Sequence, residues 1–218
     1  MHSDLLNYLI IFLYILAIFT ISLVYKILRP LNKEFLRKII HIGIGPIIPL
    51  AQYLQINQSS ALIFTGLISV LILTNYKYRI ITIIEDVDRK SFGTFFYCLS
   101  LFIMILCFWE KDPLSLITGF FIMTFGDGLA ALIGKNIKSK KWYLFNQQKS
   151  LLGTLTMFTT SFIILLSINY VGGYTLNLNI LIIALLSTFL EQVSIFGIDN
   201  LTVPIFASIS FNLLVSNT

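Results

Sequence analysis

Long apolar runs separated by short polar segments dominate this sequence. Of its 218 residues, 57% are hydrophobic and 11% are charged, whereas soluble domains average about 25% charged residues. Apolar runs of about 18 residues or more are typical of membrane-spanning helices. Strands of a membrane β-barrel would alternate polar and apolar residues, and runs such as 62–73 do not. The sequence therefore predicts an all-α, polytopic integral membrane protein with a single transmembrane domain over residues 1–218.

The positions of the apolar runs predict seven or eight transmembrane helices. The expected spans lie at about 5–25, 39–54, 60–75, 92–109, 113–133, 151–169, 179–197 and 201–216. The second and third are short, because a crossing needs about 20 residues. The second is expected to break or kink at Gly43, Gly45, Pro46 and Pro49. A break at membrane depth indicates either a structural kink or a substrate cleft.

The basic residues predict how the chain is oriented in the membrane. All 15 lysines and arginines except Lys111 lie in three alternate polar segments, 26–38, 76–91 and 135–149. Because cytoplasmic loops carry an excess of lysine and arginine, these segments are expected in the cytoplasm and the N-terminus outside. Membrane orientation accounts for the net charge of +5 better than a nucleic-acid partner does.

Acidic residues within the expected spans are the strongest candidates for function. A carboxylate inside a span costs about 2.5–3.5 kcal/mol to insert, so it normally has a partner or a task. Asp127 lies near the cytoplasmic end of the fifth span, where Gly126 and Gly128 are expected to keep the backbone open. Glu191 lies within the seventh span, and Asp199 falls in the tight turn before the eighth, where it is either functional or an ordinary turn residue. These three carboxylates are predicted to hold one or two Mg²⁺ ions, which prefer oxygen ligands.

Two other cytoplasmic segments carry groups that can bind phosphate. Arg37 and His41 would share one face of a helix, with Lys38 beside them. This trio is either a phosphate-binding patch or a basic pair that flanks a membrane helix. The fourth span begins with Ser91, Gly93 and Thr94, which offer hydroxyl and backbone N–H groups. These groups either bind phosphate or form an ordinary helix cap.

Taken in order, these residues resemble those of the CTP-dependent polyprenol kinases, the family of dolichol, phytol and farnesol kinases. Five segments carry the resemblance: RKIIH (37–41), RKSFGT (89–94), GDGLAALIG (126–134), KSLLGT (149–154), and Glu191 with DNLTVP (199–204). The short chain looks most like the phytol kinase branch. It departs from the family at Leu151 and Leu152, where a glutamate is common, and at Gly128, where alanine is common.

The resemblance implies transfer of the γ-phosphoryl group of CTP to an isoprenoid alcohol (phytol, farnesol or a polyprenol) at the cytoplasmic membrane surface. It implies that Asp127 is catalytic, either as a Mg²⁺ ligand or as the base that accepts the alcohol proton. Lys149 is the second catalytic candidate, as a charge on the phosphates. Glu191 and Asp199 are further candidate Mg²⁺ ligands. The implied nucleotide contacts are Arg37, Lys38, His41, Ser91, Gly93, Thr94, Gly134, Ser150 and Gly153.

Two other functions stay open at this point. Relatives of these kinases include phosphatidate cytidylyltransferases, so nucleotidyl transfer that makes a CDP-lipid is an alternative reaction. An ion-coupled transporter, with Asp127 and Glu191 along an ion pathway, is an alternative from another class. The clustering of polar groups on one membrane face argues against a transporter, because a pathway needs polar groups through the midplane.

Overall fold

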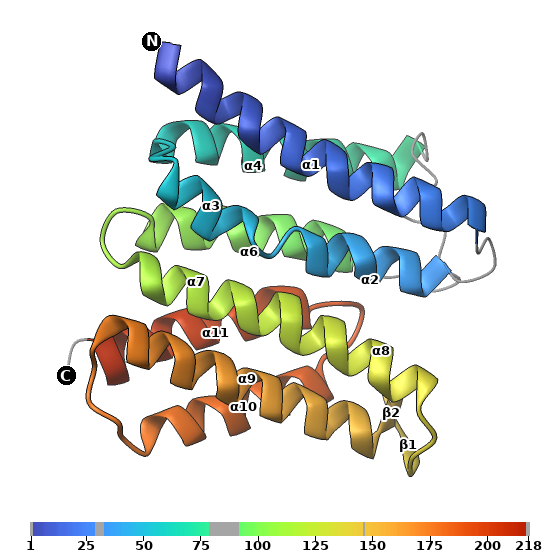
Figure 1. The fold of residues 1–218 in the computed structure, drawn as a ribbon. Coiled ribbons are helices and arrows are strands. Elements are labelled where there is room, and N and C mark those ends of the chain that lie inside the picture. Colours follow the sequence, from blue (N-terminus) through green and yellow to red (C-terminus); the bar gives the residue numbers. More distant parts are fainter. Residues whose placement is uncertain (1, 29–32, 79–91, 146, 217–218) are drawn as a thin grey trace.

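The chain folds into a bundle of helices that lie roughly side by side (Figure 1). The computed structural model describes residues 2–28, 33–78, 92–145 and 147–216. Helices make up 81% of the structure, which confirms the all-α class. One β-hairpin occurs among the described residues, and the sequence did not predict it. Its strands are β1 (Lys141–Leu144) and β2 (Gln147–Ser150).

The described helices follow the expected apolar runs. The first half of the chain forms α1 (His2–Leu28), α2 (Lys33–Gly43), α3 (Ile47–Tyr53), α4 (Gln58–Tyr78) and α6 (Gly93–Phe108). The second half forms α7 (Pro113–Phe121), the π-helix η1 (Ile122–Asp127), α8 (Gly128–Asn136), α9 (Leu151–Gly172), α10 (Asn179–Val193), α11 (Asp199–Phe211) and the π-helix η2 (Asn212–Ser216). The expected break in the second span is confirmed, because α2 ends at Gly43 and α3 begins at Ile47. The third span is longer than predicted, since the polar residues at both ends of α4 continue its helix.

Membrane crossing requires helices that are both long and apolar. Among the described residues, four helical segments are long and apolar enough to cross a bilayer: Leu5–Leu28, Gln58–Tyr78, Pro113–Asn136 and Leu151–Gly172. The helices α6 and α10 are apolar but shorter, with 16 and 15 residues. These four segments support a membrane protein, but the predicted count of seven or eight transmembrane helices is not confirmed.

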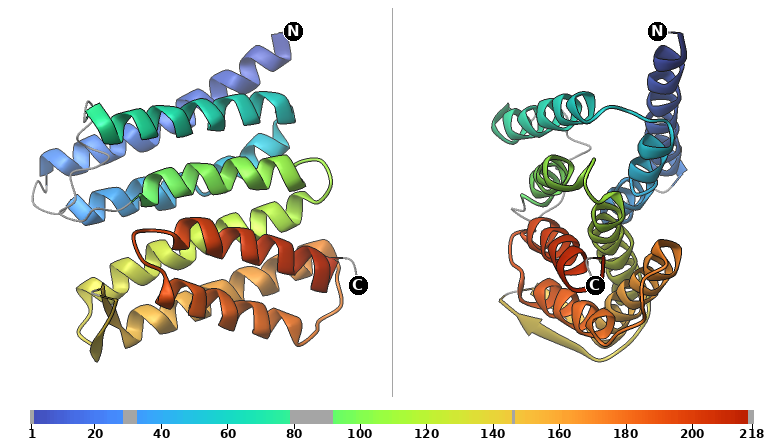
Figure 2. Two further views of the ribbon diagram at one scale, coloured as in Figure 1. Left: turned by 180° about the vertical axis from the view of Figure 1, so that it is seen from behind. Right: turned by 90° about the vertical axis from the view of Figure 1, so that its left-hand side faces the viewer.

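The rod formed by α7, η1 and α8 runs through the middle of the bundle (Figures 1 and 2). Of the residues in its most apolar stretch, 61% are buried, compared with 11% of those in α1 and 22% of those in α4. Two apolar clusters meet on it. Ile122 packs with the cluster of α9, α10 and α11, and Phe120 and Met123 pack with the cluster of α3 and α6. This central position leaves α1 and α4 as the most exposed long helices, and it places Asp127 where several elements meet.

The ends of the basic segments gather at one end of the bundle. In Figure 1 the end of α1, the start of α2, the end of α4 and the hairpin all lie at the right. Both termini and the α6–α7 turn lie at the opposite end. The arrangement of the helices thus agrees with the prediction that the three basic segments lie on the same side of the membrane. Most of the second segment, residues 79–91, lies outside the described residues.

Close packing between α7 and α11 depends on Gly119. A Cβ atom at this position would overlap Ser208 Oγ and the backbone carbonyl oxygen of Pro204. Small residues allow such close approach between helices in membrane proteins. The contact joins the central rod to α11, the helix that begins with Asp199.

We expect Gly119→Ala to lower the melting temperature of the purified protein markedly, because the new methyl group meets backbone that cannot move aside. Overpacking of this kind costs about 1–3 kcal/mol or more. The matched control is Gly66→Ala in α4, whose Cβ would lie 3.4 Å from the Phe102 ring, an ordinary contact. Thermal unfolding in detergent compares the two variants. Equal stability of both would contradict the close α7–α11 contact.

Candidate active site

Asp127 ends the π-helix η1 within the central rod. Turns of π-helix are rare and frequently occur at functional sites. The side chain of Asp127 is 13% exposed. The flanking glycines serve close packing and not an open backbone, which corrects the sequence-based expectation. A Cβ at Gly128 would lie 2.5 Å from Ile42 Cγ1, and one at Gly126 would lie 2.8 Å from Met157 Sδ. The two glycines therefore let α2 and α9 approach the rod on either side of Asp127.

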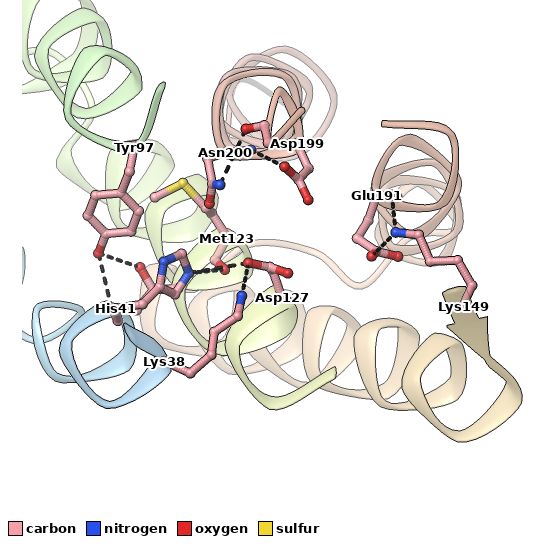
Figure 3. Close-up of polar contacts among 11 residues, drawn as sticks. Lys38, His41, Tyr97, Met123, Asp127, Lys149, Glu191, Asp199 and Asn200 are labelled. Atoms are coloured by element: carbon pink, nitrogen blue, oxygen red, sulfur yellow. Dashed lines mark hydrogen bonds and ion pairs between the residues drawn. The ribbon is translucent and has the colours of Figure 1, made fainter. Parts of the chain in front are cut away.

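Helix α2 brings a lysine and a histidine to Asp127 (Figure 3). Lys38 Nζ lies 2.6 Å from Asp127 Oδ2, although the two residues are 89 positions apart. Only 2% of the Lys38 side chain is exposed, and a buried charge is costly unless it is paired. His41 Nε2 lies 3.5 Å from the same carboxylate oxygen and 3.2 Å from Met123 O. Because both of those oxygens are acceptors, Nε2 carries the proton.

Two residues that the sequence did not single out hold this arrangement in place. Tyr97 from α6 donates to the backbone oxygen of His41 at 3.2 Å, and its hydroxyl lies 3.2 Å from Thr124 Oγ1 in η1. The rings of Tyr97 and His41 are 4.7 Å apart. These contacts join α2, α6 and the π-helix around His41. They favour a role for His41 in orienting the Asp127 carboxylate, and phosphate binding by His41 stays a prediction.

The hairpin carries Lys149 to the end of α10. Lys149 Nζ lies 2.5 Å from Glu191 Oε1 and donates to the backbone oxygen of the same residue at 2.9 Å. The side chains of Lys149 and Glu191 are 11% and 10% exposed. Strand β2 directly precedes α9, so this ion pair ties the start of α9 to the end of α10.

Three carboxylates converge between these elements. One oxygen from each of Asp127, Glu191 and Asp199 lies within 4.8 Å of the others, and Figure 3 shows their side chains around one common space. They belong to η1, α10 and α11. Asp199 is the first residue of α11 and not part of a free turn, and its Oδ1 accepts the Asn200 N–H at 3.1 Å. The structure thus brings together the residues predicted as metal ligands.

The two lysines predicted as phosphate contacts pair with two of these carboxylates. Lys38 pairs with Asp127, and Lys149 pairs with Glu191. The sequence predicted the lysines as phosphate contacts and the carboxylates as metal ligands, whereas in the structure each of these lysines pairs with one of the carboxylates. The result is a compact group of three acidic and two basic side chains, from which both a cation and phosphate oxygens can find ligands.

Three of the remaining predicted phosphate contacts, Gly134, Ser150 and Gly153, make packing or capping contacts in the described chain, and their contact with phosphate stays a prediction. Ser150 caps α9 by accepting the Gly153 N–H at 3.2 Å. A Cβ at Gly134 would lie 2.6 Å from Ser150 Oγ, so these three small residues join α8 closely to α9. Arg37 lies beside Lys38 on α2, Gly93 is the buried first residue of α6, and Thr94 follows it. Ser91 lies outside the described residues.

Comparison with known proteins identifies the family. The chain is 37% identical to a phytol kinase of the cyanobacterium Synechocystis over 179 residues, which cover 79% of this chain and 76% of that protein. The chain belongs to the phytol kinase family. Within this family it is 25% identical to a probable chloroplastic phytol kinase of Oryza sativa, over 85% of this chain and 66% of the rice protein. It is also 26% identical to one of Glycine max, over 87% of this chain and 68% of that protein. No family model and no solved structure matches the chain.

Proposed function

We propose that this protein is a membrane kinase that transfers the γ-phosphoryl group of CTP to an isoprenoid alcohol, with phytol as the first candidate. The observation that carries the proposal is the convergence of Asp127, Glu191 and Asp199 with Lys38 and Lys149 in a member of the phytol kinase family. Phosphoryl transfer depends on positioning the reactants and on neutralising phosphate charge. A group of buried and partly buried lysines and carboxylates at one site suits both tasks.

The carboxylates fit a hard divalent cation such as Mg²⁺, which takes oxygen ligands and usually keeps several waters. Asp127 Oδ1 and Asp199 Oδ2 receive no hydrogen bond from any residue in the described ranges, while the second oxygen of each aspartate is hydrogen-bonded. Two ligand oxygens are therefore available. When bound, the ion would neutralise charge on the donor phosphates. Asp127 has a second possible task, to accept the proton of the alcohol.

The position of the site suits a substrate that is dissolved in lipid. Glu191 lies near the end of α10 and Asp199 begins α11, at the end of the bundle that carries the hairpin (Figure 1). An isoprenoid alcohol keeps its tail in the bilayer and its hydroxyl near the interface. The nucleotide would arrive from the aqueous side among the basic segments, and we place this side in the cytoplasm because of the lysine and arginine excess.

We expect the basic end of the bundle to be inaccessible from outside intact cells. In a background without Cys98 and Cys107, a cysteine at the exposed position Lys138 should resist a membrane-impermeant thiol reagent. A cysteine at Ser59, exposed at the opposite end, should react. A permeant reagent should label both and serves as the control for folding and expression. Efficient impermeant labelling at position 138 would contradict the orientation.

The proposed reaction is tested with purified protein in lipid bilayers. Phytol, farnesol and a longer polyprenol are each incubated with CTP, ATP, GTP and UTP in turn, and lipid phosphates are separated and quantified. We expect an alcohol monophosphate to form with CTP, and phytol to be the best acceptor. Transfer from another nucleotide alone would overturn the choice of donor. Failure to phosphorylate any alcohol would overturn the kinase proposal.

A further inference from the structure

Glu191 differs from the two aspartates in how its oxygens are used. Its Oε1 pairs with Lys149 Nζ at 2.5 Å, and its Oε2 accepts a hydrogen bond from Gln192 Nε2 at 2.8 Å. Each carboxylate oxygen of Glu191 thus has a hydrogen-bond partner within the protein, whereas Asp127 and Asp199 each keep one oxygen without a partner among the described residues. The three carboxylates of the site are therefore not equivalent as metal ligands.

The hydrogen bonds around Gln192 fix which way its amide points. Gln192 Nε2 also donates to Thr154 Oγ1 at 2.9 Å, and the Thr154 hydroxyl donates to Ser150 O at 3.0 Å. Because the threonine proton is directed to Ser150, a lone pair of its oxygen faces Gln192. A carboxylate only accepts. The amide group between these two acceptors must therefore be the NH₂ group of Gln192.

These contacts form a closed ring that returns to Lys149. The ring runs from Lys149 through Glu191, Gln192 and Thr154 to the backbone of Ser150, the residue that follows Lys149 in the chain. A free lysine side chain has many rotamers, and fixing them costs entropy. The ring fixes the ammonium group before any nucleotide binds. Of its three N–H donors, two are used by Glu191, so one is left for a phosphate oxygen.

We propose that Glu191 serves to hold Lys149 and not to bind the metal ion, and that Gln192 is the positioning residue that fixes the Glu191 carboxylate. The inference rests on the proposed function, in which Lys149 contacts the donor phosphates. It assigns the ion to Asp127 and Asp199. Gln192 and Thr154 then contribute to nucleotide binding without touching the nucleotide.

The test separates nucleotide affinity from metal affinity. Gln192→Met keeps the length of the side chain and removes the NH₂ group, and Thr154→Val keeps the shape and removes the hydroxyl. Each is expected to raise KM for CTP about tenfold, with a smaller change in kcat, because hydrogen bonds to charged groups are the strong ones. The Mg²⁺ concentration for half-maximal rate should stay within about twofold, since a tenfold change would report the loss of about 1.4 kcal/mol of metal binding. The matched control is Thr156→Val, whose hydroxyl donates to Leu152 O in its own helix and which should change neither value.

A double variant shows whether Gln192 acts through the lysine. In a Lys149→Ala background, Gln192→Met should raise KM no further, because interacting residues are not additive. An unchanged KM in Gln192→Met, or full additivity with Lys149→Ala, would overturn the positioning role.

Binding of metal and nucleotide can be measured without turnover, so the role of Glu191 is tested independently of the proposed reaction. Mn²⁺ is titrated into the purified protein and followed by electron paramagnetic resonance, and CTP binding is measured by equilibrium dialysis. Glu191→Gln should leave Mn²⁺ affinity nearly unchanged, while Asp199→Asn should weaken it at least tenfold. Equal weakening by both variants would make Glu191 a ligand and overturn the assignment. Absence of alcohol phosphorylation by the wild-type protein would overturn the proposed function alone, and the two binding measurements would still decide the role of Glu191.

Discussion

Asp127→Asn is expected to reduce phosphoryl transfer by about a hundred- to a thousandfold or more, the size of effect seen when a preorganised electrostatic group is removed from an active site. The substitution keeps the shape of the side chain and one oxygen but removes its charge. In the proposed site that charge is needed either for Mg²⁺ or for the proton of the alcohol. The measurement is the rate of phytyl phosphate formation from CTP. Activity near that of the wild type would contradict the role given to Asp127.

Because Asp127 is paired with Lys38, this experiment requires a control for stability. Lys38 is 2% exposed and its ammonium group is 2.6 Å from Asp127, and breaking a buried pair on one side costs about 3–5 kcal/mol. Asp127→Asn alone should therefore also lower the melting temperature. The double variant with Lys38→Met removes the unpaired charge, so it should recover much of the stability but none of the activity. Recovery of both together would show that Asp127 matters for folding and not for transfer.

Lys149→Ala is expected to lower kcat/KM for CTP by about ten- to a thousandfold. Its ammonium group is held beside Glu191 at the carboxylate cluster. Loss of a charge-assisted contact to a phosphate costs a few kcal/mol, and about 1.4 kcal/mol is tenfold in rate. Steady-state kinetics with varied CTP at saturating alcohol measure the effect.

Lys138→Ala and Lys141→Ala are the matched controls for Lys149, because they remove the same charge from exposed positions of the same segment. Exposed ion pairs are worth about 0–1 kcal/mol, so these variants should change kcat/KM less than about fivefold. A loss at Lys138 equal to that at Lys149 would indicate diffuse attraction of anions by the whole segment and would contradict a formed phosphate site.

The positions of the helices could be predicted from the sequence because local signals mark them. Apolar runs give the helix bodies, and Asp112 and Ser150 cap α7 and α9 by accepting N–H groups within the first turn. The break between α2 and α3 follows from the glycines and Pro46. The hairpin was missed because its strands have only four residues each and lie in a lysine-rich segment that resembles a loop.

The candidate site could be predicted only in part. A carboxylate within an apolar run is conspicuous, and Asp127 and Glu191 were found in this way. Their lysine partners were not found, because the pairing depends on how α2 and the hairpin are rotated against the central rod, and spacing along the chain does not give that rotation. Tyr97 and Thr124 carry one hydroxyl each within apolar runs and no motif marks them. Gln192 offered a signal that was overlooked, a second polar side chain next to Glu191 inside a span.

The central claim is that phosphate moves from the end of CTP to an alcohol in the bilayer. The most direct measurement incubates the purified protein in lipid bilayers with phytol and CTP that carries a radioactive label in either the γ or the α phosphate. Our account predicts labelled phytyl monophosphate with γ-labelled CTP and no labelled lipid with α-labelled CTP. Lipid labelled from the α phosphate would indicate cytidylyl transfer and would contradict the account, as would the absence of labelled lipid with both.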